Sequence, residues 1–125
     1  MQCCLIVDDS DIIRKVAGQF AERAGYMIIE AGDGAQALTA CRARVPDVIL
    51  LDWQLPGMSP LEFLRELRTV STGAWPQILY MMTELDIADL TAVHSAGITD
   101  FILKPFYRET LMAKLAEFAR AGHIA

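Results

Sequence analysis

The sequence has 125 residues, of which 54% are hydrophobic, and a formal net charge of −5. This length suits one compact domain, so we expect residues 1–125 to form a single domain without an attached output domain. The acidic balance, with no cluster of Lys and Arg, argues against DNA binding. The apolar runs are far shorter than the roughly 20 residues that span a bilayer, and no export signal precedes them. We therefore expect a cytoplasmic protein without membrane insertion.

The first half of the chain alternates short apolar runs with apolar residues at helical spacing. Residues 3–7 ("CCLIV") predict a strand, and residues 26–30 ("YMIIE") predict a second one. The helical spacing between them predicts a helix that ends at Gly25. Its expected inward-facing residues are Ile13, Val16, Ala17, Phe20 and Ala24. After the second strand, Asp33 is expected to cap a helix, with Gln36 three residues further on.

The second half repeats this alternation three more times. Residues 47–51 ("DVILL"), 77–82 ("QILYMM") and 100–103 ("DFIL") predict further strands. The best-marked helix begins at "SPLEFLRELR", where Ser59 and Glu62 can form a capping box. The residues expected to face inward from the last three helices are Leu61, Leu64 and Leu67, then Leu90 and Val93, and finally Leu111, Leu115 and Phe118.

Five repeats of strand then helix indicate an α/β fold. They predict one parallel sheet with helices on both faces, joined by right-handed crossovers. In open, doubly wound sheets of this kind, ligands bind at the carboxyl ends of the strands, near the point where the strand order reverses. The residues that directly follow the strands are therefore the candidate site.

Polar side chains follow four of the five predicted strands. Asp8 and Asp9 come after the first strand, Asp52 after the third, Thr83 after the fourth and Lys104 after the fifth. We expect them to meet at one edge of the sheet. Three carboxylates at one place repel one another, and Mg²⁺ prefers such oxygen ligands. The sequence therefore predicts a Mg²⁺ site, with the lysine balancing the third negative charge.

A carboxylate in such a site can act as a nucleophile and form an aspartyl-phosphate. Phosphoryl transfer depends mainly on positioning and on charge stabilisation. The metal can bridge the attacking carboxylate and a phosphoryl oxygen, while Lys104 and Thr83 hold the other oxygens. No cysteine, serine–histidine pair or HExxH pattern lies near these residues to indicate another reaction. The residues thus favour phosphorylation of an aspartate.

Four motifs in this order resemble the receiver domain of two-component response regulators, the CheY-like family. They are "LIVDDS", "ILLDWQLPGM", "MMTE" and "DFILKPF". Each is short, but each follows the expected strand, and the resemblance covers the whole chain. It implies a flavodoxin-like, doubly wound five-stranded parallel sheet with strand order 2-1-3-4-5.

The resemblance also implies a role for each matching position of the site. Asp52 matches the phosphoacceptor. Asp8 and Asp9 match the acidic pair that holds Mg²⁺, together with Asp52 and the backbone carbonyl of Gln54. Lys104 matches the lysine that contacts the phosphoryl group.

A second set of positions matches the switch of this family. Thr83 matches the hydroxyl that turns toward the phosphoryl group, and Phe101 matches the aromatic residue that turns inward when the threonine moves. The Lys104–Pro105 peptide bond is expected to be cis. The surface expected to change on phosphorylation comprises residues 86–96, 99–103 and 107–120.

The same resemblance implies the partners. A histidine kinase or a phosphotransfer protein is expected to donate the phosphoryl group, and a downstream protein is expected to read the switched surface. Chemotaxis or flagellar motor control, a phosphorelay and a role as a phosphate sink all fit. The chain is expected to be a monomer or a weak dimer, and to have no enzymatic activity beyond its own phosphorylation and dephosphorylation.

The sequence departs from the family pattern at two places. Members usually carry a small residue after the threonine, whereas this chain has Glu84, which can crowd the site and repel an incoming phosphoryl group. The family usually has Asp-Gly where this chain has Ser59–Pro60. Proline fits the first position of a helix and stiffens the approach to it, so we expect it to tune partner choice without preventing phosphorylation.

Two other functions compete with this interpretation. The stretch "GDGAQA", with Gly32, Gly34 and Ala37, fits a dinucleotide-binding fingerprint. It follows the second strand rather than the first, however, and Asp33 would face the pyrophosphate. The other alternative is a receiver-like module that binds a protein or a cyclic dinucleotide without being phosphorylated. The intact acidic set argues against it, since such a module has no need of these residues.

Overall fold

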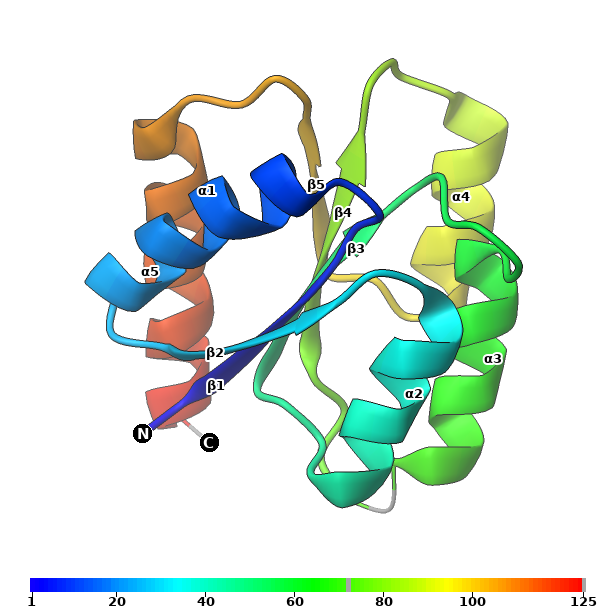
Figure 1. The fold of residues 1–125 in the computed structure, drawn as a ribbon, viewed down its shortest axis with the longest axis horizontal. Coiled ribbons are helices and arrows are strands. Elements are labelled where there is room, and N and C mark those ends of the chain that lie inside the picture. The colour runs from blue at the N-terminus through cyan, green and yellow to red at the C-terminus, as the bar shows by residue number, and fades with distance from the viewer. Residues whose placement is uncertain (72, 125) are drawn as a thin grey trace.

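The computed structural model describes the backbone of residues 1–71 and 73–124 and the side chains of residues 1–71 and 73–121. Strands and helices alternate along this part of the chain (Figure 1). The strands are β1 (Cys3–Val7), β2 (Met27–Ala31), β3 (Val48–Asp52), β4 (Gln77–Met82) and β5 (Asp100–Leu103). The helices are α1 (Asp11–Arg23), α2 (Gly34–Ala43), α3 (Pro60–Val70), α4 (Ile87–Ala96) and α5 (Arg108–Ile124). Within the described ranges, every helix is too short or too polar to cross a membrane.

The strands form one parallel sheet in the order β2-β1-β3-β4-β5, which confirms the predicted fold. Helices α1 and α5 cover one face of the sheet, and α2, α3 and α4 cover the other (Figure 1). The chain first adds β2 on one side of β1 and then adds β3 to β5 on the other side. The strand order therefore reverses between β1 and β3, where sheets of this kind bind their ligands.

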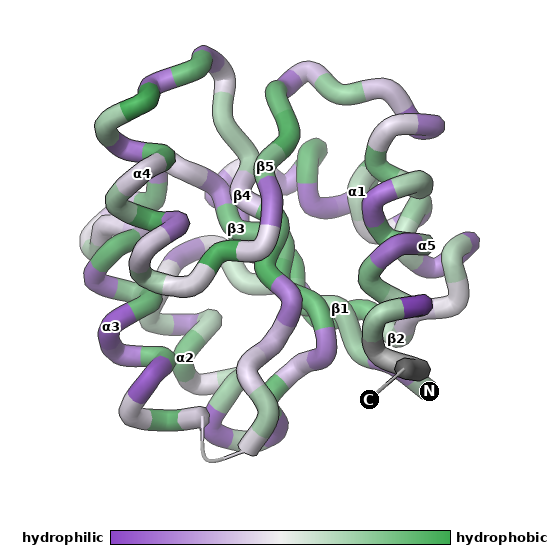
Figure 2. Tube along the Cα trace, turned by 180° about the vertical axis from the view of Figure 1, so that it is seen from behind, coloured by the Kyte–Doolittle hydropathy of each residue, from purple (hydrophilic) through white to green (hydrophobic). Residues whose placement is uncertain are grey.

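Side chains of the central strands alternate between two cores. Leu5 and Val7 of β1 pack on the side of α2 to α4, while Cys4 and Ile6 pack on the side of α1 and α5. All residues of β1 and β3 are buried, as expected for strands that are covered on both faces. The hydropathy colouring shows this apolar centre of the sheet (Figure 2). The strands that carry the acidic residues are thus enclosed by packing.

The predicted helix caps are present. Ser59 Oγ accepts a hydrogen bond from the Glu62 N–H at 3.1 Å and donates to Glu62 Oε1 at 3.2 Å. Asp33 Oδ1 accepts from the Gln36 N–H at 2.8 Å, and Gln36 Oε1 accepts from the Gly32 N–H at 2.9 Å. Both motifs satisfy N–H groups that the first turn of a helix leaves without partners.

The predicted bounds of two strands are wrong by one residue. The second strand is Met27–Ala31, because the N–H of Tyr26 donates to the Ala21 carbonyl at the end of α1 instead of joining the sheet. The third strand is Val48–Asp52, because Asp52 pairs with a residue of β4. The carboxylate that interrupts the apolar run therefore belongs to the strand itself, and the pairing of the sheet fixes its backbone.

One inward-facing prediction is also wrong. Val16 has 40% of its surface exposed, and the buried face of α1 consists of Ala17, Gly18 and Ala21. Ala17 and Ala21 belong to the core on the side of α1 and α5, whereas Val16 does not. In α4, Val93 is buried as predicted, whereas Leu90 is only half-buried.

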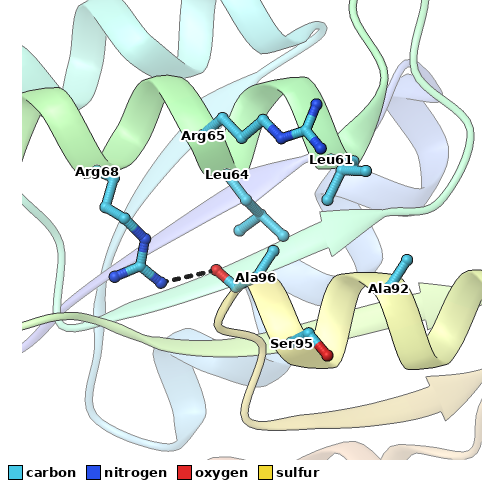
Figure 3. A pocket seen from close by; sticks show the side chains of 7 residues that line it. All are labelled: Leu61, Leu64, Arg65, Arg68, Ala92, Ser95 and Ala96. Carbon is cyan, nitrogen blue, oxygen red and sulfur yellow. Dashed lines mark hydrogen bonds between the residues drawn. The ribbon is translucent and has the colours of Figure 1, made fainter.

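The C-terminal end of α4 is fastened to α3 and to the turn before β4. Arg68 Nη2 donates to the Ala96 carbonyl at 3.0 Å across a groove between the two helices (Figure 3). The guanidinium lies 4.4 Å from the centroid of the Trp75 ring, and Trp75 Nε1 donates to the Gly97 carbonyl at 2.8 Å. Gly97 has a φ of 120°, which only glycine adopts readily, so the helix ends there.

Candidate functional site

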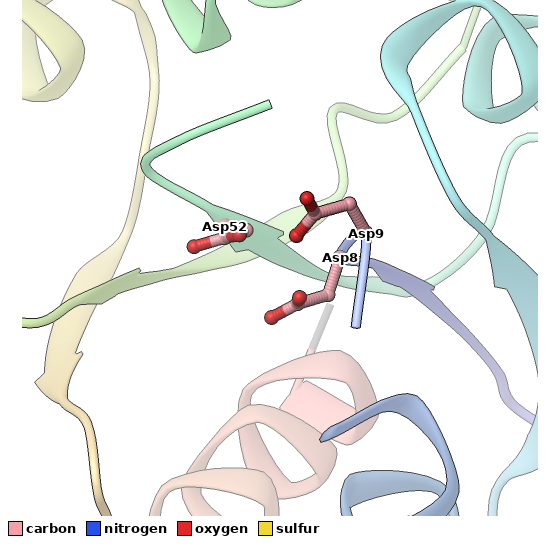
Figure 4. Close-up of side chains that lie close together, drawn as sticks. All are labelled: Asp8, Asp9 and Asp52. Atoms are coloured by element: carbon pink, nitrogen blue, oxygen red, sulfur yellow. The ribbon is translucent and has the colours of Figure 1, made fainter. Parts of the chain in front are cut away.

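Three carboxylates meet at the carboxyl edge of the sheet, as the sequence predicts (Figure 4). One oxygen from each of Asp8, Asp9 and Asp52 lies within 4.8 Å of the others. Asp8 and Asp52 have only 1% and 4% of their surfaces exposed, whereas Asp9 is exposed. Two carboxylates are therefore removed from water, and the third opens the cluster to solvent.

The turn between β1 and α1 holds the first two of these residues. The Asp8 N–H donates to the Ala31 carbonyl at 3.1 Å, which continues the pairing of β1 with β2. Asp8 Oδ1 accepts from the Ser10 N–H at 2.9 Å. Ser10 in turn caps α1, since its Oγ accepts from the Ile13 N–H at 3.3 Å. The acidic turn is thus restrained by the sheet on one side and by the helix on the other.

Lys104 joins the two buried carboxylates. Its Nζ lies 2.7 Å from Asp8 Oδ2 and 3.0 Å from Asp52 Oδ1. The Lys104 N–H donates to the Met82 carbonyl at 2.6 Å, so the residue continues the pairing of β5 with β4. The peptide bond between Lys104 and Pro105 is cis, as predicted. The ammonium group therefore connects the residue after β5 with the carboxylates at the ends of β1 and β3.

The protonation equilibria follow from this burial. Burial raises the pKa of Asp52, and the Asp8 charge raises it further, while Lys104 and a hydrogen bond from the Gln54 backbone act in the opposite direction. Burial acts to lower the pKa of Lys104, but the hydrogen bonds and charges of Asp8 and Asp52 outweigh it and raise the pKa. Lys104 is therefore held as a cation, but its contacts do not outweigh the effect of burial on the pKa of Asp52.

The sequence that forms this site matches a known protein family. The family model described as the response regulator receiver domain matches residues 4–116. The chain belongs to the response regulator receiver domain family. Receiver domains are signalling domains of two-component systems that interact with histidine kinases and are generally not enzymes.

The proteins similar to this receiver include a solved structure of nearly the same length and longer regulators. The structure of the chemotaxis protein CheY4 of Vibrio cholerae is 33% identical, with a TM-score of 0.87 over 94% of this chain and 98% of that chain. The transcriptional regulatory protein CseB of Streptomyces avermitilis is 33% identical over 120 residues, which are 95% of this chain and 50% of that protein. The DNA-binding response regulator MtrA of Mycolicibacterium smegmatis is 33% identical over 114 residues, 91% of this chain and 49% of that protein. The chain spans about half the length of the curated relatives it matches.

Receiver domains generally bind Mg²⁺ at an acidic pocket, and the three aspartates of this receiver fit such an ion. Their donor atoms are all carboxylate oxygens, which are the ligands that Mg²⁺ prefers. With all three ionised, Lys104 leaves two negative charges, which one divalent cation balances. The exposed position of Asp9 leaves a path to the cluster from solvent.

Of the remaining predicted site residues, Gln54 bonds to this cluster through its backbone, and none of the hydrogen bonds among the described residues joins Thr83, Glu84 or Phe101 to it. Thr83 and Glu84 directly follow β4 and are exposed, and the Thr83 hydroxyl makes no hydrogen bond to the residues described. Gln54 is exposed and approaches Asp52 through its backbone. Phe101 is half-buried on β5, where it packs against the core on the side of α2 to α4. The residues expected to bind and those expected to switch are thus separate in this structure.

Two contacts near the site were not predicted from the sequence. Arg14 Nη1 donates to the Asp8 carbonyl at 2.6 Å, and its Nε donates to Glu30 Oε1 at 3.1 Å. The Tyr80 hydroxyl donates to Asp89 Oδ2 at 2.7 Å. Nothing in a single sequence indicates that Arg14 makes these contacts. A tyrosine within an apolar strand does indicate a hydrogen bond, since a buried hydroxyl needs a partner.

Proposed function

We propose that this receiver accepts a phosphoryl group on Asp52 in the presence of Mg²⁺. The observation that carries the proposal is the convergence of Asp8, Asp9 and Asp52 within 4.8 Å, with Lys104 Nζ between the two buried carboxylates. A phosphoryl group has several charged oxygens, and this cluster offers a nucleophile, a cation and ligands for a metal. Catalysis of phosphoryl transfer needs mainly such positioning and charge.

The proposal assigns a role to each residue of the cluster. An Asp52 carboxylate oxygen attacks phosphorus and forms a new P–O bond while the bond to the donor breaks. Asp8, Asp9 and the Gln54 backbone carbonyl would hold the ion together with Asp52. When bound, Mg²⁺ supplies positive charge to the transferred oxygens. Lys104 exchanges part of its contact with Asp52 for a phosphoryl oxygen, and Thr83 contacts another.

The donor we propose is a phosphohistidine on a histidine kinase or a phosphotransfer protein. Such a donor has to cover the carboxyl edge of the sheet to bring its phosphorus to Asp52. Large apolar side chains surround this edge: Ile12 in the first turn of α1, Leu103 before Lys104, and Tyr107 before α5 are 75%, 44% and 79% exposed. The residues that supply most of the binding energy of a typical protein interface are enriched in Tyr, Trp and Arg, so Tyr107 is the strongest candidate contact among the three.

The switch we propose connects Thr83 to Phe101. The phosphoryl group adds negative charge and acceptor oxygens, which favour an arrangement in which Thr83 approaches Asp52. Phe101 lines a groove of about 410 Å³ between α4 and β5, which leaves room for its ring to move. Phosphorylation shifts the equilibrium only if it stabilises one arrangement more than the other.

The output we propose is a protein target that binds α4, β5 and α5. CheY4 of Vibrio cholerae is a chemotaxis protein, and the similarity to it supports a role in motility. The names of CseB and MtrA support control of transcription, and those proteins are about twice as long as the matched segment. Phosphotransfer profiling against the candidate kinases of the source organism distinguishes the two pathways, because each kinase belongs to one of them.

Incubation with acetyl phosphate tests the assignment of Asp52. We expect the intact mass to increase by one phosphoryl group with Mg²⁺ and to stay unchanged with a chelator. The Asp52→Asn variant should show no increase, and Asp33→Asn, which alters an aspartate on the loop before α2, should label as the parent does. Labelling that persists in Asp52→Asn contradicts the proposal. Full signalling by Asp52→Ala in cells would instead favour a binding module that works without phosphorylation.

A further inference from the structure

Tyr80 is a tyrosine in the centre of the sheet. It is 0% exposed and lies on β4, between Leu51 of β3 and Phe101 of β5 in the register of the sheet. It packs in the core on the side of α2 to α4. A buried hydroxyl is costly without a partner, and here the partner is Asp89 of α4, whose Oδ2 accepts at 2.7 Å.

The bond between these two residues spans the connection between β4 and α4. Thr83, Glu84, Leu85 and Asp86 make up this connection, and all four are exposed. Asp86 Oδ1 accepts from the Asp89 N–H at 3.0 Å, so the first turn of α4 is closed around the same aspartate. The side chain of Asp89 therefore attaches the α4 end of the connection to the buried sheet, while its other end, at Thr83, directly follows β4.

The Thr83 side chain is exposed, and none of the side-chain hydrogen bonds among the described residues joins its hydroxyl to the acidic cluster. The other end of α4 is held by Arg68 and Trp75. Movement of the connection toward Asp52 thus has to begin at the N-terminal end of α4. There Leu90 packs against the core, and the Tyr80–Asp89 hydrogen bond ties the helix to the sheet interior.

We propose that Tyr80 and Asp89 are positioning residues that hold the β4–α4 connection, and with it Thr83, in the arrangement that does not contact Asp52. The hydrogen bond thereby opposes the switch and sets how strongly phosphorylation must favour it. This inference rests on the proposed function, because it concerns the movement of Thr83 toward a phosphoryl group on Asp52.

The chemistry of the bond suits this role. Burial raises the pKa of Tyr80, and the hydrogen bond to Asp89 raises it further, so the hydroxyl remains a donor. Asp89 is half-buried and can turn to water when the bond breaks, whereas Tyr80 cannot. An arrangement with α4 displaced leaves a buried hydroxyl without a partner, and such a group is unfavourable. The bond therefore stabilises the observed arrangement specifically.

Tyr80→Phe tests the inference, because it removes the hydroxyl and keeps the ring that fills the core. The probe is beryllofluoride with Mg²⁺, a phosphoryl analogue, titrated while the NMR signals of Phe101 are followed. A hydrogen bond of ordinary net strength, lost from one arrangement only, predicts that the variant binds the analogue roughly two- to ten-fold more tightly than the parent. A purely structural role predicts a lower melting temperature with unchanged or weaker analogue binding.

A double-mutant cycle completes the test. Asp89→Ala should also bind the analogue more tightly, and the Tyr80→Phe/Asp89→Ala variant should add nothing to either single change. Asp89→Asn keeps an acceptor oxygen and should stay nearer the parent. Equal affinity of parent and Tyr80→Phe overturns this inference alone. Failure of the parent to bind the analogue overturns the proposed function, and this inference with it.

Discussion

The two halves of the carboxyl edge differ in how firmly they are held. On one side, Asp8, Asp52 and Lys104 are largely buried, and their side chains bond to one another. On the other side, Thr83 and Glu84 are exposed, and Val93 is the buried residue of α4. The first region is arranged for chemistry before any phosphoryl group arrives. The second is held by few contacts, which is typical of segments that move in a response.

Replacing the cation of the buried region should have the largest effect. In Lys104→Met, Asp8 and Asp52 lose their shared partner, and we expect a loss of about 3 kcal/mol in the free energy of unfolding without Mg²⁺. Added Mg²⁺ should restore part of it, because an ion that binds only the folded state stabilises it. Urea unfolding with and without Mg²⁺ measures both.

Lys114→Met provides the matched control for this variant. Lys114 also pairs with a carboxylate, that of Asp100 at 2.6 Å, but both side chains are more exposed. Removal of this pair should change the free energy of unfolding by less than about 1 kcal/mol. If the free energy of unfolding falls equally in the two lysine variants, burial does not strengthen the contribution of Lys104.

The pH dependence of stability should separate Asp52 from the rest of the chain. Its folded pKa is raised above that of the unfolded chain, chiefly by burial. The folded state therefore binds more protons between the two values, and stability falls as pH rises through that interval. Asp52→Asn lacks this group, so without metal it should be more stable than the parent at neutral pH, and the difference should shrink on acidification.

Lys104 also contributes to the pH dependence of stability, but over a different pH range. Its pKa is also raised, so its stabilisation persists from acidic to neutral pH and is lost only when pH rises through its alkaline folded value. Urea unfolding of the parent, Asp52→Asn and Lys104→Met at several pH values, with a chelator present, measures both contributions. If the free energy of unfolding depends on pH in the same way for Asp52→Asn and the parent in the acidic range, the fall in stability with rising pH does not come from Asp52.

Glu84 tests the exposed region, where effects should be smaller. Removing this charge from beside Thr83 should speed labelling by acetyl phosphate roughly two- to five-fold, in line with the energies of exposed charges. The gain should shrink at high salt, because exposed charges are screened. Glu66→Ala removes an exposed glutamate from α3 and is the control. Identical rates for the parent and Glu84→Ala rule out a role for this residue.

Pro60 should have the smallest effect of the four. Ser59 caps α3 through the Glu62 N–H, and this bond does not depend on the proline. We therefore expect Pro60→Ala to change the free energy of unfolding by less than about 1 kcal/mol and to leave acetyl phosphate labelling unchanged. Ser59→Ala removes the cap and should cost about 1 kcal/mol. A large labelling defect in Pro60→Ala would link the approach to α3 with the acidic cluster.

Much of the fold could be predicted because local and global preferences agree. The alternation of apolar runs and helical spacing predicts the parallel sheet, and the topology brings Asp8, Asp9, Asp52 and Lys104 to one edge. The errors occurred where tertiary contacts decide the outcome. Tyr26 donates its N–H to the end of α1 rather than to the sheet, and Val16 lies outside the stripe of small residues that α1 buries.

The sequence by itself determined which residues reach the carboxyl edge, because strand direction and side-chain alternation follow from short-range pattern. It did not determine which of them bond. Lys104 bridges Asp8 and Asp52, while Thr83 is exposed and makes no hydrogen bond to them among the described residues. Nor did it pair Tyr80 with Asp89, because the partner of a buried hydroxyl depends on how α4 packs on the sheet. Such contacts join residues from separate elements, so only the tertiary structure decides the balance between the rigid and the movable side of this receiver.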